Sequence, residues 1–146
     1  MVRASPIRLA VPAVAGIVGT LLVSSCSARV ALHPVRGKVL VAGKPAVGAI
    51  VVLHPLEPPA LGLRPPSGRV EADGSFTLST LVAGDGAPAG EYRVAIAWLG
   101  DVSKADPVTG EVPVKLAPRY ADPKTSDLRA HIKEGPNELP PFQLTK

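Results

Sequence analysis

Cys26 is the residue whose chemistry is most readily inferred, because it is the only cysteine among the 146 residues of this chain. Its thiol cannot form a disulfide within the chain, so a nucleophilic sulfur at this position needs another use. Two arginines, the apolar run 9–23 and two serines precede it. This order of positive charge, apolar run and small residues is typical of a cleaved export signal. The run is also interrupted by Pro and Gly and falls short of the ~20 residues of a spanning helix.

The four residues that end at this cysteine, Val23-Ser24-Ser25-Cys26, resemble the lipobox of bacterial lipoproteins. The resemblance implies a diacylglycerol thioether on Cys26 and cleavage just before it. Residues 1–25 are then a signal peptide, and residues 26–34 are a lipidated tether. Each buried CH₂ contributes about 0.8 kcal/mol, so two or three acyl chains hold firmly to a membrane. An ordinary cleaved signal that leaves a free thiol and an uncleaved short anchor are the alternatives.

The location implied by this resemblance is the bacterial cell envelope. Ser27 follows the cysteine, and by resemblance to lipoproteins of better-known envelopes this favours the outer membrane over retention in the inner membrane. The first expected partner is therefore the membrane itself, through the palmitate-type lipid on Cys26.

Tyrosine and histidine side chains offer a second chemistry, the binding of iron. The chain resembles intradiol dioxygenases in having two tyrosines and three histidines, namely Tyr92, Tyr120, His33, His54 and His131. It lacks the closely paired histidines of that family, and one tyrosine falls on a strand face that should be buried. We therefore expect no iron site.

Two Asp-Gly pairs, Asp73-Gly74 and Asp85-Gly86, suggest calcium, but neither has carboxylates at the alternate positions of a calcium loop. They are better suited to turns. No Gly-x-Ser-x-Gly elbow is present for nucleophilic catalysis. The sequence thus predicts no catalytic residue, no metal and no cofactor, and we do not expect an enzyme.

An aromatic platform for a sugar is the remaining candidate site. Phe76, Tyr92 and Trp98 are expected in the core, because each aromatic ring buries a large apolar area. Tyr120 is then the main candidate for ligand binding, and the ligand would be a cell-wall or extracellular polysaccharide.

Length and charge limit the remaining possibilities. Without residues 1–25 the chain keeps 121 of its 146 residues, which suffices for one domain. The formal net charge of +4 falls by two when Arg3 and Arg8 are removed. The remaining basic residues are scattered along the chain, so we expect no nucleic-acid partner.

The elements that must carry these residues are short strands. Apolar residues alternate with polar ones in several segments, Gly and Pro separate these segments, and none shows a helical period. The Asp73-Gly74 pair predicts a tight hairpin, and Pro140-Pro141 restricts the last strand to an edge or a bulge. Seven strands and an antiparallel β-sandwich are predicted, with strands at residues 35–41, 49–54, 68–72, 75–79, 91–98, 127–133 and 137–144.

Four segments in order resemble the carboxypeptidase regulatory-like domain, namely VRGKV at 35–39, GKPAVGAIV at 43–51, ADGSF at 72–76 and PAGEYRV at 88–94. The resemblance implies a transthyretin-like Greek-key sandwich of seven antiparallel strands over residues 35–146. It also implies a non-catalytic accessory module.

A structural or protein-binding module in the envelope is therefore the expected function, and a carbohydrate-binding module is the alternative. The surfaces expected to contact an envelope protein are the two long loops, 55–67 and 99–118, because loops carry recognition on rigid β scaffolds. The exposed edge near Pro140-Pro141 offers a second surface, through strand addition.

Overall fold

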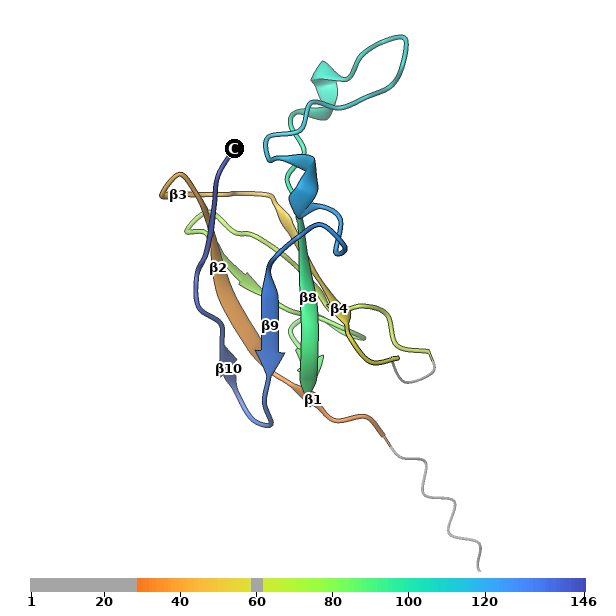
Figure 1. The fold of residues 1–146 in the computed structure, drawn as a ribbon, viewed down its shortest axis with the longest axis vertical. Coiled ribbons are helices and arrows are strands. Elements are labelled where there is room, and N and C mark those ends of the chain that lie inside the picture. The colour runs from red at the N-terminus through yellow and green to blue at the C-terminus, as the bar shows by residue number, and fades with distance from the viewer. Residues whose placement is uncertain (1–28, 59–61) are drawn as a thin grey trace, which may run out of the picture.

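The computed structural model describes residues 29–58 and 62–146, and nearly all of their regular structure is β (Figure 1). The all-β prediction is confirmed in these residues. The signal peptide and Cys26 lie outside them. The described elements are β1 (Leu32–His33), β2 (Val35–Val41), β3 (Lys44–Pro45), β4 (Ile50–Pro55), β5 (Ser67–Arg69), β6 (Ser75–Thr77), β7 (Ala87–Pro88), β8 (Gly90–Ala97), β9 (Arg129–Ile132), β10 (Asn137–Glu138), β11 (Phe142–Leu144) and the 3-10 turns η1 (Val102–Lys104) and η2 (Pro118–Tyr120).

One sheet is organised around β2. The alternation predicted for this strand is confirmed, since Val35, Val39 and Val41 are buried while Arg36 and Lys38 face solvent. Branched side chains at a period of two fit one buried face of a pleated strand. β2 pairs with β3 and β6 in antiparallel fashion, and with β10 and β11 in parallel fashion.

The parallel pairing corrects the prediction of a wholly antiparallel fold. Asn137 lies opposite Val35, and Phe142 lies opposite Val39. The chain reaches β10 from β9, which belongs to the other sheet, and it arrives running in the direction of β2. Because a proline has no N–H to donate to a ladder, Pro140-Pro141 divides the last strand into β10 and β11. Both pair only with β2 among the described strands, as expected for an edge.

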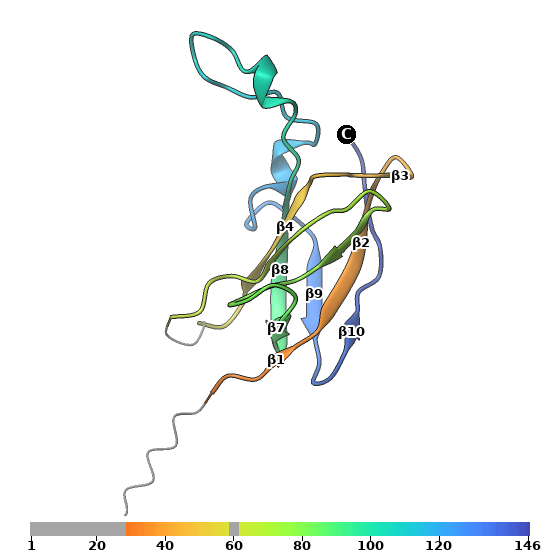
Figure 2. The ribbon, with the colours of Figure 1, turned by 180° about the vertical axis from the view of Figure 1, so that it is seen from behind.

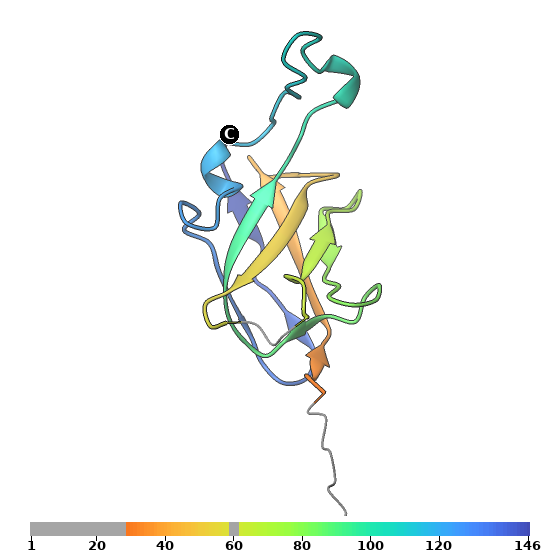
Figure 3. The ribbon, with the colours of Figure 1, turned by 90° about the vertical axis from the view of Figure 1, so that its right-hand side faces the viewer.

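The second sheet has the order β5-β4-β8-β9 and is antiparallel throughout. Its best-patterned strand is β8, where Tyr92, Val94 and Ile96 are buried as predicted. β9 alternates in the same way, with Ala130 and Ile132 buried. Figure 3 shows β4 and β8 side by side with β2 behind them, so the two sheets form two layers.

The hairpin predicted at Asp73-Gly74 forms, but its register differs from the predicted one. Glu71 N–H donates to Ser75 O at 2.8 Å, and Ser67 pairs with Ser79 in an antiparallel bridge. Otherwise β5 pairs with β4 and β6 pairs with β2, so the hairpin connects the two sheets. Val70 is held on the β4 side, because its N–H donates to Ala49 O at 2.8 Å. Of the two turn residues only Gly74 has a positive φ, +85°, whereas a two-residue type I′ turn needs positive φ at both.

The core lies between the two layers. Phe76 of β6 and Phe142 of β11 stack with ring centroids 6.3 Å apart. Gly37 in β2 makes room for this pair, since a Cβ there would lie 2.6 Å from the Phe76 ring. Leu53, Ile96 and other apolar residues of the second sheet close the core from the opposite side.

The two ends of the domain carry different features. Figures 1 and 2 show the chain entering at one end, beside β1, while a long loop after β8 projects beyond the sheets at the opposite end. Within the described ranges, no helix has the length and apolar character needed to cross a membrane.

Candidate functional site

The end of the predicted tether belongs to the domain. Residues 32–33 form β1, which pairs with β7 through Leu32 opposite Pro88. The imidazole of His33 also accepts a hydrogen bond from the N–H of Gly135, with Nδ1 and N 3.0 Å apart. The point at which the chain enters the domain is therefore fixed by contacts with two segments that are distant in sequence.

Tyr120 is not the open aromatic platform predicted from the sequence. Its side chain is only 8% exposed and belongs to the core cluster. Its hydroxyl lies 3.4 Å from Thr145 Oγ1 and accepts a hydrogen bond from Arg119 at 2.7 Å, and the Arg119 guanidinium lies 4.7 Å from the ring centroid. These partners, Thr145 first and then Arg119, lower the pKa of Tyr120. The prediction failed because Tyr120 lies in a turn, η2, that packs against β8.

The tyrosines and histidines considered for iron serve separate places in the fold. The Tyr92 hydroxyl donates to Pro88 O at 2.8 Å, and His131 pairs with Glu91 on the outer face of the β8–β9 ladder. His33 is occupied by Gly135. In residues 29–58 and 62–146, no three His, Cys, Asp or Glu side chains gather as a metal site would require.

The Asp-Gly carboxylates shape turns, as the sequence indicated. Asp73 accepts hydrogen bonds from both the N–H and the hydroxyl of Ser75. Asp85 accepts hydrogen bonds from the N–H groups of Thr80, Leu81 and Val82. Burial opposes the charge on Asp85, but these three donors outweigh it and lower its pKa.

The projecting loop after β8, residues 98–115, is an ordered hairpin held by its own backbone hydrogen bonds. We call it the arm. At its base Leu99 pairs with Val114 in an isolated bridge, and Lys115 N–H donates to Trp98 O at 2.8 Å. Gly100 allows the two sides to approach, since a Cβ there would lie 2.6 Å from Pro113 O. Nearer the tip, Asp106 N–H donates to Glu111 O at 2.8 Å.

Two aspartates fix the turns within the arm. Asp101 accepts a hydrogen bond from the N–H of Ser103 and begins η1. Asp106 accepts from the N–H groups of Val108 and Thr109 at 2.7 and 2.9 Å. Since the carboxylates satisfy backbone donors at both turns, the arm is preorganised by its own sequence.

Apolar side chains are exposed along the arm. Val108 at the tip is 91% exposed and Val102 on η1 is 71% exposed, while Leu99 and Val114 at the base are more than half exposed. The sequence predicted this loop as a recognition surface but did not predict that these side chains are exposed. A loop has no regular alternation of buried and exposed positions from which their exposure could be inferred. The available signal was the spacing of valines within a segment rich in polar residues, Gly and Pro.

Trp98 anchors the arm to the body of the domain. Its indole Nε1 donates to Val47 O at 2.9 Å, and the Lys115 ammonium lies 5.2 Å from its ring centroid. The ring was predicted to point into the core, and it is instead partly buried and packed against the core's edge. Because Lys115 covers it, Trp98 does not offer an open platform either.

A comparison with protein-family models and with curated proteins gives no match. Among solved structures, the chain is similar to a DUF3823 family protein from Parabacteroides merdae, with 17% sequence identity and a TM-score of 0.37. The match covers 77% of this chain and 44% of that one, so the chain spans less than half the length of that structure. With so low a TM-score, the fold and site described above rest on the chain's own geometry.

Proposed function

We propose that this chain is a lipid-anchored envelope protein whose single β-rich domain binds another envelope protein through the arm. The observation that carries the proposal is the arm itself. It is a preorganised hairpin that exposes four large apolar side chains, at the end of the domain opposite the entering chain (Figure 2). Exposed apolar residues gathered on a projecting element are typical of a protein-binding surface.

Preorganisation favours a binding role over that of a spacer. An ordered loop loses less conformational freedom on binding than a flexible one, so more of its contact energy appears as affinity. Asp101 and Asp106 supply that order in the arm. A partner would bury the valines and also meet exposed charged side chains of the arm, which include Lys104 and Glu111.

We also propose the finer fold assignment, a transthyretin-like Greek-key sandwich of the carboxypeptidase regulatory-like kind. Two layers, a core between them and a crossing from β5 to β6 support it. The parallel strands β10 and β11 differ from a wholly antiparallel sandwich. In this assignment they are strands added to the edge of the sheet beside β2. A non-catalytic role, attachment through Cys26 and a place at the outer membrane complete the proposal.

Binding through the arm is tested by crosslinking in intact cells followed by affinity purification of the chain. We expect wild type to recover one dominant envelope protein, and the double variant Val102→Asp/Val108→Asp to lose it while remaining folded and membrane-bound. The matched control is Leu81→Asp/Val82→Asp, because these side chains are 65% and 67% exposed on a different loop. The control should recover the partner as wild type does.

Recovery of the same protein by the arm variant would contradict the proposal. If no protein is enriched with any variant, retention of the chain on cell-wall or extracellular polysaccharide becomes the next test. That alternative now needs a surface other than the buried Tyr120 ring.

A further inference from the structure

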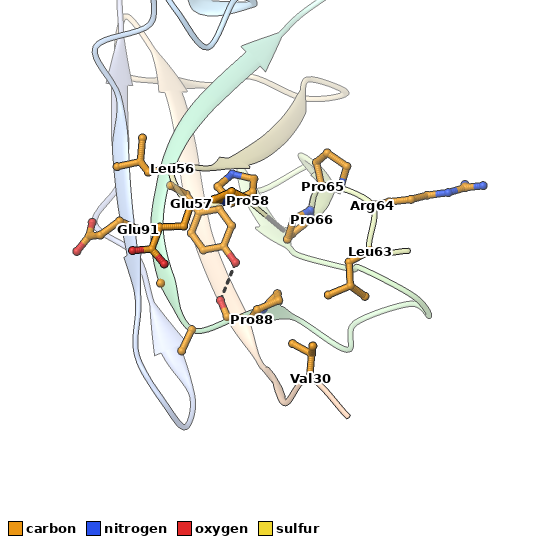
Figure 4. Close-up of a pocket in the computed structure, with 14 residues that line it drawn as sticks. Val30, Leu56, Glu57, Pro58, Leu63, Arg64, Pro65, Pro66, Pro88 and Glu91 are labelled. Carbon is orange, nitrogen blue, oxygen red and sulfur yellow. Dashed lines mark hydrogen bonds between the residues drawn. The ribbon is translucent and has the colours of Figure 1, made fainter. Parts of the chain in front are cut away.

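A hollow of about 450 Å³ opens beside the point where the chain enters the domain (Figure 4). It lies between the loop after β4 and the β7–β8 corner, and its walls include Leu56, Leu63 and Val30. Its volume falls within the roughly 300–1,000 Å³ of ordinary small-molecule pockets. The hollow belongs to neither the arm nor the core.

The walls of this hollow are apolar for a specific reason. Five prolines contribute to them, namely Pro55, Pro58, Pro65, Pro66 and Pro88. A proline presents ring carbons and has no N–H, so none of these five positions contributes a backbone donor to the walls. The fixed φ of each proline also keeps the walls in place.

Of the polar side chains that line the hollow, Glu57 is exposed to solvent, and the other three are hydrogen-bonded, ion-paired or directed away from it. The Tyr92 hydroxyl donates to Pro88 O at 2.8 Å, and burial raises the pKa of Tyr92, which keeps the hydroxyl protonated. Arg64 extends away from the hollow (Figure 4), and Glu91 pairs with His131. A flexible apolar chain suits this space better than a polar ligand.

The sequence places such a chain within reach. Val30 lines the hollow and follows Cys26 by four residues, which can span at most about 14 Å. We propose that one acyl chain of the lipid on Cys26 lies in this hollow, an inference that rests on the lipid anchor proposed above. The covalent link gives the chain a high effective concentration at the hollow, and the remaining acyl chains stay in the bilayer.

An acyl chain in the hollow would also set the orientation of the domain on the membrane. With an acyl chain bound at the entering end, the domain would be held with that end against the membrane. The arm, at the opposite end, would then point away from the bilayer (Figure 1).

The test is photo-crosslinking from inside the hollow in cells that make the full chain. A benzophenone amino acid is placed at Leu63 and, in a second chain, at Leu56, so that local damage at one position cannot decide the result. The matched control position is the exposed Leu81. After irradiation and digestion, mass spectrometry reports both the lipid on the Cys26 peptide and any link from it to the probed position.

We expect a link between the acylated Cys26 peptide and positions 63 and 56, several-fold more abundant than from position 81. Adding Leu56→Asp to the chain probed at Leu63 should remove most of that link without changing the mass of the lipidated Cys26 peptide. Links from the hollow to free phospholipid, or no link although Cys26 carries its lipid, would overturn this inference and leave the anchor intact. A Cys26 peptide without lipid would overturn the anchor and this inference together.

Discussion

Individual carboxylates order the turns of this domain, and Asp85 shows how. It accepts hydrogen bonds from three successive N–H groups, while Thr80 Oγ1 donates to Gly86 O in the same loop. Hydrogen bonds to a charged acceptor are stronger than neutral ones. The loop before β7 therefore depends on the charge of one side chain.

Asp85→Asn should destabilise the domain by about 1–2 kcal/mol at neutral pH, because the amide cannot accept from all three donors. The pKa of Asp85 is lowered from the usual 3.8, so its contribution is fully present above that pH and is lost as the pH falls through the folded-state pKa. Urea unfolding of wild type and variant at several pH values measures this. A difference that stays constant at acid pH would contradict the assignment, and the exposed Asp127→Asn serves as the control.

Tyr120 should behave as a core residue in mutational tests. Tyr120→Ala is expected to lower the free energy of unfolding by about 3 kcal/mol, which is the usual result of deleting a buried aromatic ring. Tyr120→Phe keeps the ring and loses only the hydrogen bonds to Arg119 and Thr145, which should lower stability by about 1 kcal/mol. Thermal unfolding of both variants is the measurement, and a fully stable Tyr120→Ala would restore the exposed-platform interpretation.

At the scale of elements, the strands could be predicted from the sequence, but most of their partners could not. Alternation identifies β2, β8 and β9, because a buried face imposes a period of two on one strand at a time. Pairing between distant segments depends on contacts that no single segment shows, so the division of β5 and β6 between two sheets and the parallel β10 and β11 leave no local signal. The turn at Asp73-Gly74 could be predicted because turn chemistry is local, but its register could not, since Glu71 rather than Ala72 bonds to Ser75.

The candidate sites also differ in whether local sequence or tertiary packing determines them. Lipidation of Cys26 stays a prediction, because it rests on the neighbours of that residue in the sequence and the described residues begin at 29. The loop 99–118 was correctly singled out as long and irregular. Burial of Tyr120 and exposure of Val108 could not be predicted, since both depend on whether a loop packs back against the sheets.

The junction between β1 and β7 should be the backbone contact that is least tolerant of change. Gly86 has φ +89°, and a Cβ there would lie 1.8 Å from His33 O. Gly84 has a similar φ, +75°, with no atom within 4 Å of its would-be Cβ. Gly84→Ala should lower the free energy of unfolding by roughly 1–2 kcal/mol, because it introduces only the strain of a left-handed backbone. Gly86→Ala should lower it by well over that amount, because it adds the clash with His33. Denaturant unfolding of both variants measures the difference, and equal losses would mean that the β1–β7 contact is not made.

At the scale of the whole molecule, the proposed account separates attachment from recognition. The chain enters at one end and the arm projects from the other (Figure 1), so a lipid on Cys26 would leave the arm free for a partner. The two functions should be separable by mutation.

Cys26→Ala, in a chain whose residues 1–25 are replaced by an export signal that is cleaved without lipidation, should move from the membrane fraction to the soluble fraction, because a chain without acyl groups has no comparable affinity for a bilayer. Its secondary structure by far-UV circular dichroism should match that of wild type, since Cys26 precedes the described domain. Fractionation of cells and the mass of the mature Cys26 peptide measure attachment. Membrane retention of Cys26→Ala equal to wild type would contradict the lipid anchor.

The most direct test of the central claim is photo-crosslinking from the tip of the arm in intact cells. A benzophenone amino acid at Val108, the most exposed apolar residue of the arm, should yield one abundant adduct with an envelope protein, and the same probe at Leu81 should not. An adduct of equal yield from both positions, or none from Val108 in a chain shown to be folded and lipidated, would contradict recognition through the arm.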